Sequence, residues 1–163
     1  MNAAEMHQAN SRAVEQITTF YIDGDLFGID VLKIEEVTGK HKVFEVPRAP
    51  GFVRGLVNLR GQIATALGLR ELFLKSTNLE KEKMSVVCKL DGNLVALVVD
   101  SIGDVVEIER SFFEPPPDTI PGEIRRFIKG IYKMNGSFMS VIDLESIGKE
   151  FAPSVDPATG RIN

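Results

Sequence analysis

Apolar residues along this chain occur in short runs that alternate with polar residues and end at glycine-containing pairs, and one long pattern of this kind occurs twice. Residues 52–73 (FVRGLVNLRGQIATALGLRELF) align without a gap with residues 127–148 (FIKGIYKMNGSFMSVIDLESIG), 75 positions later. Four residues are identical in the two copies: Phe52 and Phe127, Gly55 and Gly130, Gly61 and Gly136, and Leu69 and Leu144. Most other apolar positions exchange one apolar residue for another. A repeat of this length indicates a duplicated module.

Each copy of the repeat predicts a β-hairpin. Apolar residues run up to a two-residue turn, Arg60-Gly61 in the first copy and Asn135-Gly136 in the second, and resume after it. Glycine at the second position suits a turn that requires positive φ. The apolar stretches at 69–73 and 143–150 then predict one or two helical turns after each hairpin, and we expect another helical turn near 30–34.

The two halves of the chain also begin alike. Residues 21–29 resemble residues 89–97, and both contain Asp-Gly, the commonest short hairpin turn. Each half therefore reads as strand, turn, strand, strand, long connection, strand, turn, strand. Because five short strands cannot bury a flat sheet in so few residues, we expect each half to curl into a barrel. The sequence predicts an all-β fold of two tandem five-stranded barrels.

Composition shifts along the chain suggest where the domain begins and ends. Residues 1–15 are polar and Ala-rich, so we expect a flexible N-terminal tail, followed by one domain over 16–152 and a C-terminal tail over 153–163. Within the domain we place the first barrel at about 24–83 and the second at about 84–150, with an N-terminal strand that both could share. The charged segment 74–83 is the expected link between them, and the prolines of 114–122 predict a loop.

Composition and charge narrow the class of protein. Of 163 residues, 44% are hydrophobic and 26% charged, which is typical of a globular chain. The net charge of −4 argues against a nucleic-acid or anionic-membrane partner. Cys88 is the only cysteine, so no intramolecular disulfide can form. The polar N-terminus lacks an apolar signal core and no run is long enough to insert into a membrane, so we expect a cytoplasmic protein.

Candidate catalytic and metal-binding chemistry is sparse. One cysteine and two histidines do not provide the ligand spacing of a zinc site. Cys88 and His41 could form a nucleophilic pair, but Cys88 follows Val86-Val87 in an expected core strand, where a thiol acts as a small apolar side chain. No glycine-rich phosphate-binding motif occurs. We therefore expect no cofactor, no metal and no enzymatic activity.

Two segments carry a specific resemblance. Residues 27–37 (FGIDVLKIEEV) and 46–61 (VPRAPGFVRGLVNLRG) resemble the CheW-type chemotaxis coupling proteins, and the similarity extends over about residues 17–150. The resemblance implies two SH3-like five-stranded barrels. It also implies a non-catalytic adaptor that links the cytoplasmic tips of chemoreceptors to the regulatory domain of a CheA-type histidine kinase, recruited to membrane-associated receptor arrays.

The resemblance also implies a receptor-binding site in a groove between the barrels. Its charged members would be Glu36 and the turn residue Arg60. The turn itself supports this, because Arg60 stands where the second copy has Asn135, and arginine is not selected there for turn conformation. An exposed, solvated charge is the alternative interpretation. The remaining expected receptor-binding residues are Ile34, Gly55, Val57 and Ile63.

The chain departs from the family pattern just after this turn. Thr65 and Gly68 replace the usual proline and aspartate, so the helix after the first hairpin loses a side-chain cap that Asp143 retains in the second copy. This departure leaves open an adaptor of an alternative chemosensory pathway, for surface motility, pilus control or second-messenger signalling. A small-barrel nucleic-acid-binding protein is the rival from another class, but it needs a basic groove with exposed aromatic residues, and the chain has no Trp and two Tyr.

Overall fold

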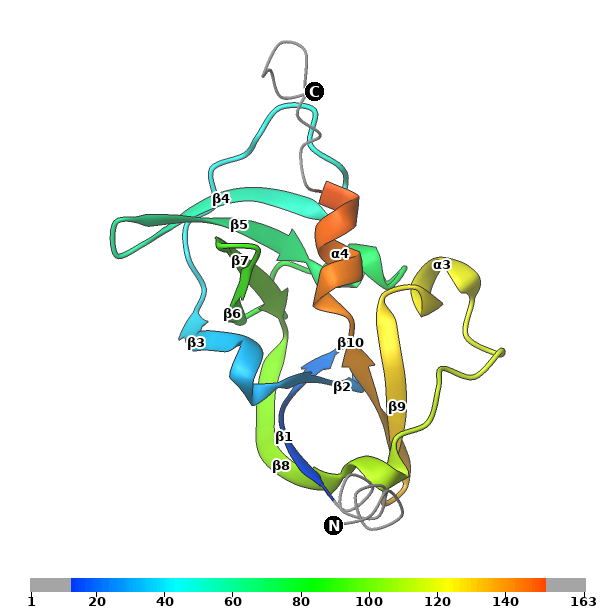
Figure 1. The fold of residues 1–163 in the computed structure, drawn as a ribbon. Coiled ribbons are helices and arrows are strands. Elements are labelled where there is room, and N and C mark those ends of the chain that lie inside the picture. The colour runs from blue at the N-terminus through cyan, green and yellow to red at the C-terminus, as the bar shows by residue number, and fades with distance from the viewer. Residues whose placement is uncertain (1–12, 152–163) are drawn as a thin grey trace, which may run out of the picture.

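The computed structural model describes residues 13–151, which form ten strands in two five-stranded sheets with a few short helices (Figure 1). The prediction of an all-β fold with two SH3-like barrels is confirmed. The elements are β1 (Val14–Ile22), β2 (Asp25–Asp30), η1 (Val31–Lys33), β3 (Ile34–Gly39), β4 (Val53–Leu59), β5 (Gln62–Gly68), α2 (Leu69–Leu72), β6 (Met84–Leu90), β7 (Asn93–Val99), β8 (Ser101–Glu109), η2 (Arg110–Phe112), α3 (Gly122–Arg125), β9 (Ile128–Met134), β10 (Ser137–Ile142) and α4 (Leu144–Phe151).

The Asp-Gly turns form as the sequence predicts. Asp23 and Gly24 have φ of 52° and 84° between β1 and β2, and Asp91 and Gly92 have φ of 49° and 81° between β6 and β7. Positive φ at both central residues is the signature of the primed turn that joins two twisted antiparallel strands, and aspartate tolerates it better than most residues. Local sequence therefore determines these two hairpins.

The barrels are not consecutive along the chain, so the expected division at residues 83–84 is wrong. One sheet has the order β3-β6-β7-β5-β4, and we call it the middle barrel (34–99). The other has the order β8-β1-β2-β10-β9, and we call it the terminal barrel (14–30 and 101–142). The first hairpin of each half pairs with the other half, through parallel contacts of β2 with β10 and of β7 with β5. The two repeats have exchanged their first hairpins.

The chain passes between the barrels at places other than the expected link. Residues 74–83 lead from α2 to β6, and β5 and β6 on either side of this connection both belong to the middle barrel. The crossings lie instead at η1 and at Asp100, the single residue between β7 and β8. At the second crossing, the buried Arg70 side chain donates to both Asp100 carboxylate oxygens, at 3.0 and 2.5 Å. Asp100 also accepts from the backbone N–H of Asp23 at 2.8 Å. These bonds hold the β1–β2 turn against the crossing.

Three apolar clusters make up the core. Two are small and draw their buried residues from one sheet each, so they fill the two barrel interiors. The third and largest contains residues of both sheets and of α4, including Phe27, Val86, Leu97 and Ile147, and it joins the barrels. The run 94–99 serves two clusters in alternation, because neighbouring side chains of a strand point to opposite faces. This confirms the expected strand buried on both faces.

Several boundaries differ from the expectations. Strand β1 begins at Val14, inside the expected tail 1–15, because its first residues pair with Ile108 and Glu109 of β8. The expected loop over 114–122 runs into the short helix α3, and η2 adds a helical turn before it. The expected C-terminal tail at 153–163 lies outside the described residues. Within 13–151, no helix is both long and apolar enough to cross a membrane, and no metal-binding cluster of acidic, His or Cys residues is found.

Candidate functional site

The two charged residues expected at the site form an ion pair with each other. Arg60 Nη2 lies 3.2 Å from Glu36 Oε2. Glu36 is on β3 and Arg60 is in the β4–β5 turn, so the pair links the two strands at opposite ends of the middle barrel's sheet order. The Arg60 side chain is 87% exposed and that of Glu36 is 28% exposed. The guanidinium is therefore presented to solvent while its partner is held in the barrel wall.

The backbone of Arg60 is in an unfavourable conformation. Its φ is 54° and that of Gly61 is 89°, and the Asn58 side chain accepts from the Gly61 N–H at 2.8 Å. Left-handed backbone favours Gly, Asn or Asp, and arginine there is uncommon. The predicted positive φ of Gly61 and Gly136 is confirmed, with 77° for the latter.

The two repeat turns are nevertheless not of the same kind. Asn135 is absent from the residues with positive φ, so only the glycine of its turn is left-handed, which is typical of a type II turn. The first repeat thus places arginine where asparagine would suit the backbone, and the second repeat places asparagine where any residue would fit. The backbone conformation of the turn therefore gives no reason for an arginine at position 60.

Of the expected apolar lining, only Ile63 and Ile34 reach the surface near the pair. Ile63 is 60% exposed on β5 and pairs across the hairpin with Asn58. Leu56, which the sequence interpretation missed, is 37% exposed on the same face of β4. Ile34 is half-buried against the shared core. The period-two alternation of side chains along a strand could have identified Leu56, because it places Leu56 and Val57 on opposite faces of β4.

Val57 and Gly55 lie elsewhere, which corrects the expectation that they line the groove. Val57 is 3% exposed and belongs to the interior cluster of the middle barrel. Gly55 is buried with a φ of 140°, and a side chain at this position would meet the Phe44 carbonyl group. That carbonyl group accepts a hydrogen bond from the Leu56 N–H at 2.8 Å. Gly55 therefore allows the β3–β4 connection to approach β4, and neither residue offers a surface to a partner.

The Cys88 and His41 pair does not assemble. Cys88 is completely buried, and burial raises the pKa of its thiol to about 12. A thiol with so high a pKa carries almost no nucleophilic thiolate at neutral pH. The His41 ring instead lies 3.0 Å from the Thr38 hydroxyl group. The residues therefore favour the core interpretation of Cys88.

The departure at Gly68 has a local physical reason. Helix α2 begins after Gly68 without a side-chain cap, as expected. A side chain at this position would meet the Glu71 carboxylate and the Arg54 guanidinium. Arg54 pairs with Glu71 at 2.7 Å and with the buried Glu82 at 2.6 Å. In the second copy, Asp143 does cap α4, accepting from the Ser146 N–H at 3.2 Å.

Comparison with known proteins agrees with this architecture. A family model described as CheW-like domain matches residues 16–151. The chemotaxis protein CheW of Treponema pallidum is 27% identical over 137 residues, 81% of either chain. That of Helicobacter pylori is 26% identical and covers 91% of this chain and 90% of its own.

A solved structure shares the fold. The crystal structure of scaffolding protein TtCheW from Thermoanaerobacter tengcongensis has a TM-score of 0.75 to this chain, with 24% identity, and the match covers 93% of this chain and 100% of that one. At this identity the similarity supports the fold, and the family follows from the model match. Because that match spans most of the sequence, the chain belongs to the CheW-like domain family.

Proposed function

We propose that this chain is a non-catalytic adaptor that couples the cytoplasmic tips of chemoreceptors to the regulatory domain of a CheA-type histidine kinase. The relatives are named chemotaxis proteins, and the structural neighbour is titled a scaffolding protein. The observation that carries the proposal is the Arg60–Glu36 pair, an exposed guanidinium on a rigid hairpin with its carboxylate partner in the barrel wall. The adaptor is recruited from the cytoplasm to receptor arrays.

The geometry of Arg60 suits recognition. A residue kept in a strained conformation that a neighbouring repeat avoids indicates a use outside folding. A guanidinium group binds a carboxylate with two parallel hydrogen bonds, a geometry that lysine cannot reproduce. Ile63 and Leu56 add exposed apolar surface on the outer face of the same hairpin. Together they form a polar and apolar surface of the kind that a helical receptor tip can cover.

Titration of a soluble receptor cytoplasmic fragment tests the proposal. Truncation of a charged contact that becomes desolvated on binding costs about 2 kcal/mol or more, roughly thirtyfold in affinity. We expect Arg60→Ala and Glu36→Ala each to weaken binding by this amount, and Asn135→Ala, at the matched turn of the other repeat, to leave it unchanged. Thermal melts of all three variants check that folding is retained.

Equal affinities of wild type, Arg60→Ala and Asn135→Ala would show that the receptor does not contact this turn. A pull-down from cell lysate followed by mass spectrometry tests the partners independently. Recovery of a chemoreceptor with a CheA-type kinase supports the adaptor role, and the identity of the kinase distinguishes the main chemotaxis pathway from an alternative chemosensory pathway. Recovery of nucleic acid in place of both would contradict it.

A further inference from the structure

The two barrels have equivalent cavities of unequal size. The cavity at the mouth of the middle barrel has a volume of about 370 Å³, and that of the terminal barrel about 160 Å³. The repeat makes them comparable: Val57 and Ala66 occupy the positions of Tyr132 and Val141, 75 residues later in the sequence. Side chains at equivalent positions of the two cavities can therefore be compared directly.

Six pairs of equivalent positions line both cavities, and in four of them the middle barrel has the smaller side chain. Of these four pairs, the hairpin repeat matches two and the alignment of the Asp-Gly turns matches a third. The fourth is matched by the equivalent backbone bridges Phe44–Leu56 and Glu114–Ile131. These four pairs, with the middle barrel first, are Val57 and Tyr132, Ala66 and Val141, Ser85 and Ile17, and Val43 and Phe113. In the other two pairs, Arg54 with Lys129 and Val98 with Asp30, the middle barrel does not have the smaller side chain.

The terminal barrel fills its own interior. Tyr132 is 0% exposed, its ring centroid lies 5.3 Å from that of Phe113, and its hydroxyl group donates to Glu15 at 2.8 Å. Barrel interiors normally reach this density, because an unfilled apolar space costs stability. The middle barrel has the same strand arrangement, but its smaller side chains at the four positions leave the larger cavity at its mouth. A volume in the lower range of ligand-binding pockets, with apolar side chains such as Val57 and Val98 beside a few charged groups, is typical of a binding site.

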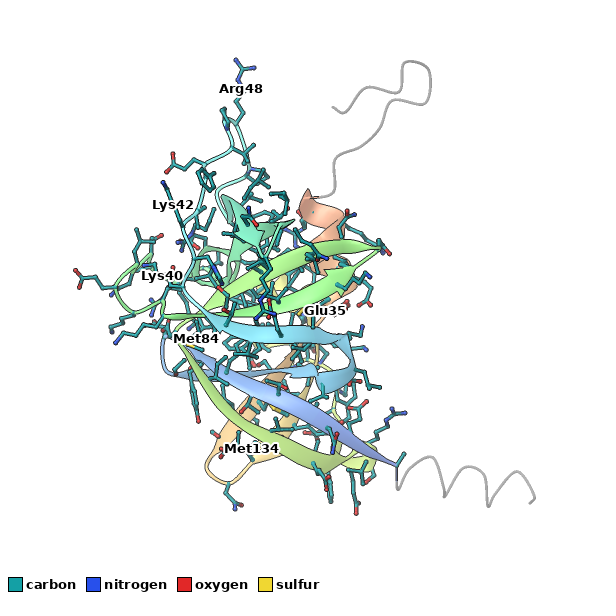
Figure 2. All side chains as sticks on the ribbon, turned by 90° about the vertical axis from the view of Figure 1, so that its left-hand side faces the viewer. Glu35, Lys40, Lys42, Arg48, Met84 and Met134 are labelled. Atoms are coloured by element: carbon teal, nitrogen blue, oxygen red, sulfur yellow. The ribbon has the colours of Figure 1, made fainter. Side chains whose placement is uncertain are left out.

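The mouth of the middle-barrel cavity is rich in basic groups. Lys40, His41 and Lys42 line it consecutively, and Figure 2 shows Lys40 and Lys42 in succession along the connection from β3 to β4. Lys40 donates to the Leu79 carbonyl group at 2.9 Å, across the mouth. Glu45 is the acidic group of this rim. Two lysines against one glutamate leave a positive rim on a chain whose net charge is −4.

Arg54 also lines this cavity, but acidic side chains already neutralise its charge. It donates to Glu82 at 2.9 and 2.6 Å and to Glu71 at 2.7 Å. Burial disfavours its charge, yet the hydrogen bonds to Glu82 and Glu71 outweigh burial and raise its pKa. Arg54 thus closes one wall of the cavity, and the lysines of the rim are the cations available to an anionic ligand.

We propose that the middle-barrel cavity binds a small amphipathic anion, with its apolar body among Val43, Val57 and Val98 and its anionic group at Lys40 and Lys42. The volume exceeds what one protein side chain fills, which favours a free small molecule over an apolar residue inserted by a partner. The site is separate from the proposed receptor contact, since neither Glu36 nor Arg60 lines the cavity. Medium-chain carboxylates have the required size and charge.

Calorimetric titration of the full chain with sodium decanoate tests the proposal. We expect one molecule bound per chain and weaker binding at high salt, because the rim charges are screened. The variant Ala66→Val/Ser85→Ile gives the middle barrel the residues of the terminal barrel and fills the cavity. It should weaken decanoate binding about tenfold or more, since inserted methyl groups in a confined space cannot be accommodated.

Matched controls separate the cavity from general apolar binding. Lys40→Ala/Lys42→Ala should weaken decanoate several-fold, and decyltrimethylammonium, with the same chain and the opposite charge, should bind more weakly than decanoate. Equal decanoate affinity in wild type and in a folded filled variant would overturn the proposal, as would no binding below about 1 mM. If the filled variant fails to fold, methyl NMR of wild type decides: decanoate must shift Val43, Val57 and Val98, and shifts confined to Ile63 and Leu56 would refute the site.

Discussion

Replacement of Arg60 by asparagine should improve the turn and damage the proposed receptor contact in the same molecule. Arg60 has a φ of 54°, a conformation that asparagine adopts more readily than other residues with a side chain. Relief of this strain is worth about 1 kcal/mol. The substitution also removes the ion pair with Glu36, in which the Arg60 side chain is 87% exposed. An exposed pair contributes less than about 1 kcal/mol.

The relief of backbone strain and the loss of the ion pair therefore nearly cancel in the free energy of unfolding, or leave a small net gain in stability. We expect Arg60→Asn to have an unchanged Tm or one raised by about 2–4 °C, the shift that 1 kcal/mol produces in a domain of this size. Binding of the receptor fragment should fall roughly thirtyfold, because asparagine cannot form the charged two-bond contact. Differential scanning calorimetry and titration of the same sample measure both quantities.

Two results would refute this reasoning. A fall in Tm of more than about 4 °C would mean that the Glu36 pair stabilises the barrel by more than a surface ion pair does. Unchanged receptor affinity would remove the functional reason for an arginine in this turn. Asn135→Arg in the other repeat is the matched control, since it adds the same charge at the equivalent turn and should leave receptor binding unaffected.

Three further substitutions test the physical account of the fold. Gly136→Val should lower Tm by several degrees, because a β-branched residue at a φ of 77° is strained by about 1–3 kcal/mol; an unchanged calorimetric transition would contradict the turn assignment. Gly68→Asp should destabilise the fold by about 1–3 kcal/mol in urea unfolding despite providing a helix cap, because its side chain displaces Arg54 from the buried Glu82; a gain in stability would show that capping dominates. Burial opposes ionisation of Asp100, but the hydrogen bonds from Arg70 and from the backbone outweigh burial and lower its pKa. This carboxylate therefore stabilises the fold above about pH 4, and its contribution is lost as the pH falls below that value. Asp100→Asn should flatten the acid side of the stability curve, and an unchanged slope would contradict the assignment.

The sequence predicts the local structure well because hairpins depend on neighbouring residues. The Asp-Gly and Arg-Gly turns, the strand that is buried on both faces and the short helices after each repeat all follow from local pattern. The pairing of the hairpins is different. In a duplicated chain, the first hairpin of either half offers the same apolar positions to either module, so the hydrophobic pattern cannot distinguish pairing within a half from exchange.

The connections decide the exchange. Only Asp100 separates β7 from β8, and only the three residues of η1 separate β2 from β3. At such short connections the chain continues from one barrel directly into the other, whereas the longer segment 74–83 turns back within one barrel. The charge of segment 74–83 suggests the opposite, since a charged segment with few apolar residues is a typical domain link.

The positions of the candidate site residues in the fold follow from the sequence only in part. Glu36 and Arg60 were recognised from family resemblance, and their pairing in space agrees with a shared role. Val57 was grouped with Ile63, although period-two alternation and the pairing of Val57 with Ala64 place them on opposite faces of the hairpin. Leu56 shares the face of Ile63 and was missed, because resemblance points to residue types while alternation determines the side on which they lie.

The exchange of hairpins bears on how an adaptor of this design would work. Residues of both sheets meet in the largest apolar cluster, with Phe20 and Phe27 from the terminal barrel next to Val95 and Leu97 from the middle barrel. Because interior packing is dense, rotation of the barrels against each other would disrupt this cluster. A protein that links two partners in a fixed geometry needs such rigidity, since any hinge between its contact surfaces would weaken the coupling between them. In this chain the Arg60 hairpin and the middle-barrel cavity therefore keep a constant position relative to the terminal barrel, and a ligand in the cavity could alter receptor coupling only through the walls of the middle barrel that it contacts.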